Sequence, residues 1–150
     1  MEITERGLQF IRDREGFRHD AYQDQAGVWT IGYGHTEGVE PGDTISLADA
    51  ELLFRSEVAK FEHCVIEALD DHGIKVLRPH EFDALVSLTY NIGCAAFRRS
   101  TVLRRLGQGD RKGAADAILM WDKITVAGQK VTNHGLARRR RMEKALFLDG

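Results

Sequence analysis

The sequence lacks most of the features that would set it apart from an ordinary globular domain. It has only two prolines in 150 residues and no low-complexity segment, which argues against long linkers and disorder. No run approaches the roughly 20 apolar residues that a membrane-spanning helix needs. The N-terminal stretch MEITERGLQFIRDRE is charged throughout and has no signal-peptide core. We therefore expect one domain, made in the cytoplasm without an export signal of its own.

Cysteine and histidine are also too sparse to form a familiar metal or redox motif. Cys64 and Cys94 lie thirty residues apart, a spacing typical of neither zinc sites nor redox motifs. Two small buried side chains are the simplest interpretation, and a disulfide is the alternative if the protein reaches an oxidising compartment. The six histidines show no ligand spacing such as His-x3-His, so we expect no metal.

Charge is distributed unevenly along the chain, although the formal net charge is only −2. Residues 1–97 hold 8 basic and 18 acidic side chains, whereas residues 98–150 hold 13 basic and 5 acidic ones, giving net charges of −10 and +8. A surface that attracts polyanions is one interpretation, and attraction between two parts of one domain is the other. The run Arg138 to Arg141 cannot line one groove, because four successive helical residues point in four directions. Burial of some of these arginines against acids is therefore favoured over nucleic-acid binding.

The stretch EGFRHDAYQDQAGVWTIGYGHT, from Glu15 to Thr36, combines a helix end, a turn and a strand. Thr4 is a candidate cap for a helix over about residues 5–14, and a glycine follows Glu15 where helices commonly end. Glu15 then lies at a helix C-terminus, where the macrodipole disfavours negative charge and favours a protonated acid. The tetrapeptide that begins with Asp24, DQAG, suits a type I turn between two strands.

The strand after this turn alternates large and small side chains up to His35. Because successive strand residues face opposite sides, one face is large and packs, and the other carries Thr30 beside Gly32 and Gly34. We expect the Thr30 hydroxyl to face open space, with the two glycines allowing a ligand to approach closely. A bulge or a tight helix contact is the alternative explanation for the glycines.

Helical patterns account for most of the remaining chain. Ser46, with Asp49 three residues later, predicts the start of a helix of about 23 residues, long enough to bridge two lobes. Further helices are expected from Pro79 to Gly93, after a cap at Ser100, and near the C-terminus in GLARRRRMEKALF. A short helix is also expected over residues 111–121, with Trp121 in the core, followed by a loop over residues 122–134.

Glu15, Asp24 and Thr30 are the candidates for chemistry. Inverting hydrolysis of a glycosidic bond needs one protonated acid and one carboxylate that directs water, separated by about 6.5–9.5 Å. A helix end and a solvated turn are different environments, as these two roles require. The spacing alone is a weak signal in a chain with 23 acidic residues, and solvated surface acids are the alternative.

These residues resemble the Glu-x8-Asp-x5-Thr triad of the T4-type phage lysozymes, the phage endolysin muramidases of glycoside hydrolase family 24. The segments EGFRHDAY, WTIGYGHT, ISxxxAExLF, YNIG with a following Phe97, and GLxxRR are also similar to that family, over nearly the whole chain. The resemblance implies an α+β lysozyme-like fold with a hairpin lobe over about residues 1–60, a long linking helix and a helical lobe over about residues 70–150. Packing of the first helix against the second lobe is the alternative assignment for that helix.

The resemblance also implies hydrolysis of the β-1,4 bond between N-acetylmuramic acid and N-acetylglucosamine in peptidoglycan, without a cofactor. Glu15 would be the general acid, Asp24 the carboxylate that positions water, and Thr30 its hydroxyl partner. The remaining candidates are near neighbours of this triad or an aromatic residue of the second lobe. They are Gly32, Gly34 and Phe97 as substrate contacts, and Tyr33 and His35 as structural residues, with His35 paired to an acid.

Peptidoglycan is the only partner that the resemblance implies, so we expect a monomer that neither binds nucleic acid nor inserts stably into a membrane. Some relatives carry an N-terminal signal anchor that is missing here, so release to the periplasm is expected to depend on a holin. A lytic transglycosylase and an inactive sugar-binding module are the alternatives. The presence of both Asp24 and Thr30 disfavours them, because neither alternative needs an activated water.

Overall fold

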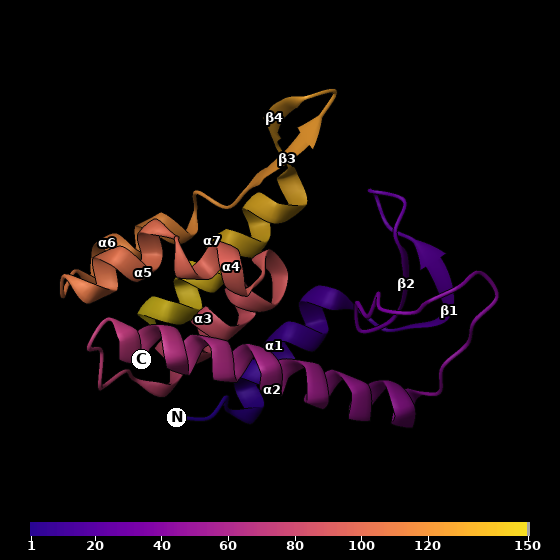
Figure 1. Ribbon diagram of the computed structural model, residues 1–150, viewed down its shortest axis with the longest axis horizontal. Coiled ribbons are helices and arrows are strands. Elements are labelled where there is room, and N and C mark those ends of the chain that lie inside the picture. Colours follow the sequence, from indigo (N-terminus) through magenta and orange to yellow (C-terminus); the bar gives the residue numbers. More distant parts are fainter. Residues whose placement is uncertain (150) are drawn as a thin grey trace. The chain divides into compact units, whose positions relative to one another are not determined.

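The computed structural model describes residues 1–149, and the chain divides into two compact units. The small unit is Gln9–Lys60, and the large unit is Met1–Leu8 together with the chain from Phe61 onward. Both boundaries between the units fall inside helices. The first lies within α1 (Glu5–Glu15) and the second within α2 (Leu47–Asp71), and each helix is continuous across its boundary (Figure 1). Helices dominate, and each of the two sheets is a two-stranded antiparallel hairpin, so the predicted α+β class is confirmed.

Helix α1 begins and ends at the residues that the sequence indicates. The Thr4 hydroxyl accepts a hydrogen bond from the backbone N–H of Gly7 at 3.1 Å, which caps the N-terminus. The helix ends at Glu15, and Gly16 follows with a φ of 72°, the left-handed conformation that suits glycine. Glu15 is therefore the last helical residue.

The first hairpin pairs β1 (Arg18–Gln23) with β2 (Trp29–Gly32) in antiparallel fashion, with a register irregularity in β1. The turn between them starts at Asp24, whose carbonyl accepts the Gly27 N–H at 2.9 Å, as the sequence predicts. The hairpin thus joins the end of α1 to the loop that leads into α2.

The prediction that this strand continues to His35 is wrong. Strand β2 ends at Gly32, because Gly32 and Gly34 adopt φ values of 63° and 84°. The backbone reverses there, and Ile31 pairs with His35 through two hydrogen bonds of 2.9 Å. The simple alternation of faces therefore fails beyond Ile31.

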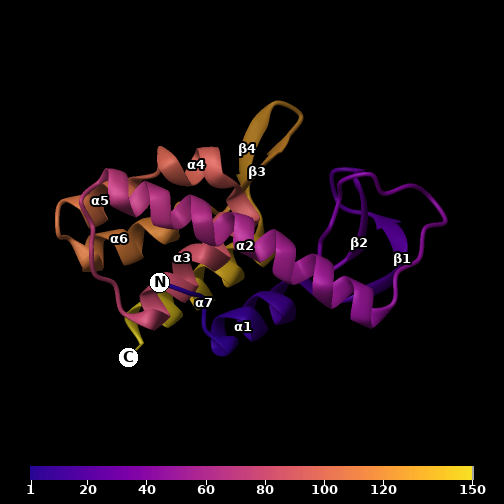
Figure 2. The ribbon, with the colours of Figure 1, turned by 60° about the horizontal axis from the view of Figure 1, so that its bottom comes forward.

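Helix α2 is 25 residues long and has the predicted cap, since the Ser46 hydroxyl accepts the Asp49 N–H at 3.1 Å. It runs without a break in both views (Figures 1 and 2). Its buried residues fall in both units, with Phe54 and Val58 in the small unit and Val65 and Leu69 in the large unit.

In the described part of the large unit, five further helices follow α2 along the chain. They are α3 (Pro79–Ile92), α4 (Cys94–Arg98), α5 (Thr101–Gly107), α6 (Arg111–Ile118) and α7 (His134–Leu148). Helix α3 packs against α7, and α5 lies beside α6 (Figures 1 and 2). As predicted, Gly93 ends α3 and the Ser100 hydroxyl caps α5 by accepting the Leu103 N–H at 3.2 Å.

A second hairpin replaces part of the predicted loop over residues 122–134. Strands β3 (Lys123–Val126) and β4 (Gln129–Thr132) project from the start of α7 (Figure 1). Ala127 and Gly128 form the turn with φ values of 51° and 81°, as a two-residue turn of this twist requires. Helix α6 ends at Ile118, earlier than predicted, which leaves Trp121 half-buried instead of in the core.

The arginine run is divided between core and surface. Arg140 is 0% exposed and Arg139 is 8% exposed, whereas Arg138 and Arg141 are exposed. The Nε of Arg140 lies 2.9 Å from a carboxylate oxygen of Glu143, which is itself 0% exposed. Burial against an acid is therefore the correct interpretation, and Arg140 has no surface to offer a polyanion.

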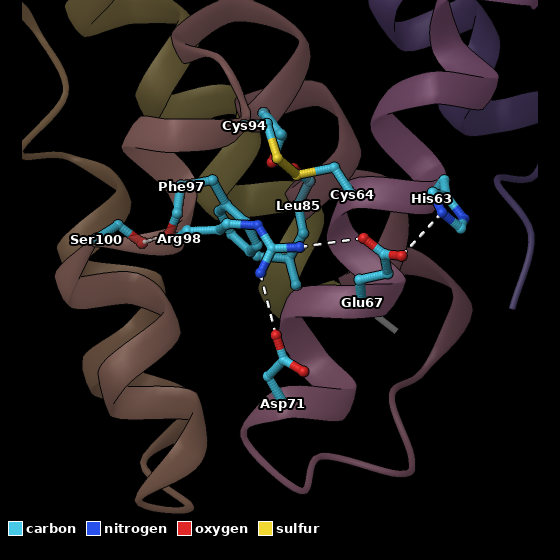
Figure 3. The surroundings of a disulfide bond; sticks show 10 residues. His63, Cys64, Glu67, Asp71, Leu85, Cys94, Phe97, Arg98 and Ser100 are labelled. Carbon is cyan, nitrogen blue, oxygen red and sulfur yellow. Dashed lines mark hydrogen bonds and ion pairs between the residues drawn. A yellow bond between two sulfur atoms is a disulfide. The ribbon is translucent and has the colours of Figure 1, made fainter.

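Cys64 of α2 and Cys94 of α4 form a disulfide, which settles the alternative left open by the sequence. Arg98 joins the same two helices, because its guanidinium lies 3.3 Å from Glu67 and 3.1 Å from Asp71 (Figure 3). The covalent bond and the two ion pairs attach α4 to the second half of α2. Within residues 1–149, no helix is both long and apolar enough to cross a bilayer.

Candidate active site

The three residues of the candidate triad all belong to the small unit. Glu15 is the last residue of α1, Asp24 opens the turn between the strands, and Thr30 lies in β2. Glu15 is half-buried and Asp24 is exposed, so the two acids do lie in different environments. Thr30 is only 4% exposed, and the expectation that its side chain faces open space is therefore wrong.

The backbone of the turn fixes the Asp24 carboxylate. One oxygen, Oδ1, accepts the backbone N–H groups of Ala26 and Val28, each at 2.9 Å. Within residues 1–149 no hydrogen bond reaches the other oxygen, Oδ2. A carboxylate held by one oxygen can accept a proton or hold a water with the second. Asp24 is therefore both oriented and accessible.

Val28 connects the Asp24 and Thr30 side chains. Its N–H donates to Asp24, and its carbonyl accepts the Thr30 hydroxyl at 2.9 Å. Since the Thr30 hydroxyl donates its one proton to this carbonyl, its oxygen is left as an acceptor for a water proton. One backbone residue thus sets the orientation of both groups.

Gly34 lies directly against the Glu15 carboxyl group. A Cβ placed on Gly34 would be 2.5 Å from Glu15 Oε1, well inside van der Waals contact. Gly32 has a different neighbour. A Cβ placed on Gly32 would point toward α2 and lie 3.4 Å from the Cβ of Ala50. The tight helix contact is the correct explanation for Gly32, whereas Gly34 leaves room for the candidate acid.

An ion pair within the small unit ties α1 to α2. The Nε of Arg12 donates to Glu51 Oε2 at 3.0 Å, and Nη2 also pairs with this carboxylate. The hydrogen bond from Arg12 is the main reason why the pKa of Glu51 lies below its ordinary value. Arg12 stands one helical turn before Glu15, so the pair fixes the end of the helix that carries the candidate acid.

Tyr33 and His35 both contact side chains of the small unit. The Tyr33 ring packs between Phe17 and Phe54, with ring centroids 5.7 and 5.2 Å apart. His35 Nδ1 is hydrogen bonded to the Glu57 carboxylate, so the expected pairing with an acid is present. Sequence periodicity places Glu57 on α2 but does not indicate which face of α2 contacts the loop that carries His35. Glu57 could therefore not be named from the sequence as the acid that pairs with His35.

Phe97 does not lie on a surface that a ligand can reach. It is 0% exposed in the core of the large unit, where it belongs to α4. The prediction that Phe97 contacts substrate is corrected accordingly. Residues 1–149 also contain no group of three or more His, Cys, Asp or Glu side chains suited to a metal ion.

Comparison with known proteins decides the family. The phage lysozyme family matches residues 12–143, which is most of the chain. The chain belongs to the phage lysozyme family. This phage lysozyme is 43% identical to the endolysin of Acyrthosiphon pisum secondary endosymbiont phage 1, with 98% of each chain covered.

Solved structures agree with this membership. The endolysin from Escherichia coli O157:H7 phage FAHEc1 superposes with a TM-score of 0.90 at 44% identity, over 99% of this chain and 94% of the other. The muramidase domain of SpmX from Asticaccaulis excentricus gives a TM-score of 0.89 at 37% identity, over 99% of each chain. The phage lysozyme described here is accordingly a peptidoglycan-degrading enzyme of the lysozyme type.

Proposed function

We propose that this phage lysozyme hydrolyses the β-1,4 bond between N-acetylmuramic acid and N-acetylglucosamine with inversion at the anomeric carbon. Glu15 gives its proton to the leaving glycosidic oxygen. Asp24 takes a proton from the water that attacks the anomeric carbon from the opposite face. The Thr30 oxygen accepts a hydrogen bond from the other O–H of this water and holds the water in line. No metal or cofactor takes part.

The fixed Asp24 carboxylate is the observation that carries the proposal. Both backbone bonds go to Oδ1, which leaves Oδ2 to act on a water. A reaction that uses no activated water, as in a lytic transglycosylase, has no need of a carboxylate oriented in this way. The close approach of Glu15 to Gly34 adds support, because the missing side chain of Gly34 leaves room for the half-buried acid at the end of α1.

Lysis of permeabilised Gram-negative cells by three proteins tests this assignment. Glu15→Gln keeps the shape of the side chain but cannot donate an acid proton, so we expect a loss of at least about 10²–10⁴-fold. Glu37→Gln is the matched control, since Glu37 is an exposed acid of the same unit, and it should lyse cells like the unmodified protein. Circular dichroism checks that both variants are folded. Lysis by Glu15→Gln at the rate of the control would remove Glu15 from its role.

A further inference from the structure

Exposed apolar side chains of the large unit gather on the β3–β4 hairpin and directly before it. Val126 and Val131 of the hairpin are 51% and 41% exposed, and Met120, which precedes β3, is 58% exposed. The other large exposed hydrophobic side chains of the described chain are spread from Met1 to Leu148. Single apolar side chains on a surface are ordinary, whereas a group of them marks a contact surface.

The strand register divides the hairpin into two different faces. Opposite residues of an antiparallel pair share a face, and successive residues alternate between faces. One face is therefore basic and hydroxylated, and the other is largely aliphatic. The first holds Lys123, Thr125, Lys130 and Thr132, and the second holds Ile124, Val126, Gln129 and Val131. Only Ile124 among these residues is half-buried, so the core of the large unit covers neither face.

A pocket of about 490 Å³ in the large unit involves only part of the hairpin. Its wall includes Trp121, Ile124 and three residues of the basic face, but neither Val126 nor Val131. The turn residues Ala127 and Gly128 are exposed, and the hairpin stands away from the helices of its unit in both views (Figures 1 and 2). The two valines and the turn therefore form a small uncharged tip that is open to solvent.

Positive charge surrounds this tip. Residues 123–142 hold six basic side chains and no acidic one, and four of the six are exposed. Lys123 is paired with Asp122, whereas Lys130 and Arg138 make no ion pair within residues 1–149. Uncompensated cations beside an apolar tip complement a surface that places anionic groups above an apolar layer. The surface of an anionic phospholipid bilayer has this structure.

The dimensions of the hairpin favour a bilayer over a second copy of the chain. Each strand has four residues, too few to supply the roughly 800 Å² per partner of a standard protein interface. A bilayer surface needs no complementary shape, and lysine stems can lie along it with their ammonium groups among the phosphates. The outer edges of both strands are unpaired, which excludes entry into the hydrocarbon core. Contact at headgroup level leaves these edges hydrated.

We propose that the β3–β4 hairpin is a peripheral contact for anionic phospholipid bilayers. Val126, Val131 and the turn enter the boundary between headgroups and acyl chains, and Lys130 and Arg138 lie near the phosphates. The contact is weak and reversible, because two valines and a few cations bury little apolar surface. This inference goes beyond the proposed function, since it concerns a surface of the large unit and no residue of the candidate triad.

Sedimentation with vesicles of phosphatidylglycerol and phosphatidylethanolamine tests the apolar part of the contact. Val126→Thr/Val131→Thr keeps β-branched side chains in both strands while making them polar. The control is Val76→Thr/Leu148→Thr, which alters two exposed apolar residues of the same unit outside the hairpin. We expect the hairpin variant to bind roughly tenfold less tightly and the control to bind like the unmodified protein. Circular dichroism checks that both are folded.

A second pair of variants tests the charge. Lys130→Gln should bind the same vesicles roughly fivefold less tightly, because one cation near the anionic surface is lost. Arg104→Gln removes an exposed cation of α5 and should have no effect. Vesicles of phosphatidylcholine alone should bind the unmodified protein less than the anionic ones. Equal losses for Lys130→Gln and Arg104→Gln would reduce the attraction to net charge and overturn the assignment to the hairpin.

Two further results would overturn the proposal. One is equal vesicle binding by the hairpin variant and its control. The other is a dimer of the unmodified protein in sedimentation velocity that Val126→Thr/Val131→Thr abolishes, since the tip would then meet a second copy. Cleavage of soluble glycan strands without vesicles is measured separately and should be the same for both threonine variants. Vesicle binding through the hairpin by a protein that cleaves no glycan would support this proposal while the proposed function fails.

Discussion

The small unit and the large unit use their charged residues in opposite ways. The small unit holds 5 basic and 10 acidic residues, a net charge of −5, and the large unit holds 16 and 13, a net charge of +3. Asp24 of the small unit is exposed and held by backbone N–H groups, whereas Arg140 and Glu143 of the large unit are completely buried and hold each other. The first arrangement leaves a charged group open to solvent, and the second buries charges inside the fold.

This difference predicts where substitutions act. In the small unit the candidate acids are positioned by a turn, a helix end and one glycine, so their loss should reduce activity more than stability. In the large unit Arg139, Arg140 and Glu143 are part of the core, so removing one of them should reduce the free energy of unfolding. The four predictions below test this division, and they begin with the largest effect.

Glu143→Ala should destabilise the protein by about 3–5 kcal/mol, because it leaves Arg139 and Arg140 buried without their shared carboxylate. Arg141→Ala is the control on the exposed side of the same helix and should change stability by no more than about 0.5 kcal/mol. Unfolding in urea measures both values. A loss below about 1 kcal/mol for Glu143→Ala would show that the buried network does not hold the large unit together.

Removing the disulfide should have the next largest effect. The double variant Cys64→Ser/Cys94→Ser opens a loop whose ends are separated by 30 residues, which should cost about 2–4 kcal/mol of stability. Dithiothreitol should lower the melting temperature of the unmodified protein to that of the variant and should leave the variant unchanged. Equal melting temperatures of the oxidised protein and the variant would contradict this account of α2 and α4.

Gly34→Ala should act on activity, as expected for the small unit. The added Cβ would lie 2.5 Å from Glu15 Oε1 and displace the acid, for which we expect a loss in kcat of about 100-fold. Gly38→Ala is the matched control, since Gly38 also has a positive φ of 71° but open space around it. Both variants carry similar backbone strain, so their melting temperatures should fall by similar amounts. The lysis rate should fall for Gly34→Ala only. Equal lysis rates would show that this contact is unimportant.

The Arg12–Glu51 pair should give the smallest effect, on the order of 1 kcal/mol. The folded protein holds the pKa of Glu51 below its ordinary value of 4.5, so this stabilisation is complete above that pH and is lost as the pH falls through the lowered folded value. Glu51→Gln removes it, and the stability difference between the two proteins should therefore shrink on acidification. Urea unfolding at several pH values measures the difference. A difference that grows toward low pH would contradict the assignment.

The parts of the fold that depend on neighbouring residues could be predicted from the sequence. The caps at Thr4, Ser46 and Ser100 and the turn at Asp24 each depend on a few adjacent residues. The β3–β4 hairpin also had a local signal, because the β-branched runs ITV and KVT flank two residues that include Gly128. Alanine at the other turn position is unusual for a positive φ and weakened that signal.

Features that depend on packing between distant segments could not be predicted. The strand alternation gave Gly32 and Gly34 the same environment, but one meets α2 and the other meets Glu15. Phe97 and Trp121 are both aromatic residues near helix ends, and only the packing of the large unit buries the first and leaves the second in a pocket wall. For the candidate site, the sequence allowed Glu15, Asp24 and Thr30 to be proposed, but the burial of Thr30 could not be predicted.

The stereochemistry of the product tests the central claim most directly. Proton NMR of a soluble glycan strand during cleavage shows which anomer of the new muramic acid reducing end forms first. Water directed by Asp24 and Thr30, with the proton supplied by Glu15, predicts the α-anomer, which then equilibrates. Initial formation of the β-anomer, or of 1,6-anhydro ends that lack an anomeric hydroxyl, would contradict the inverting mechanism.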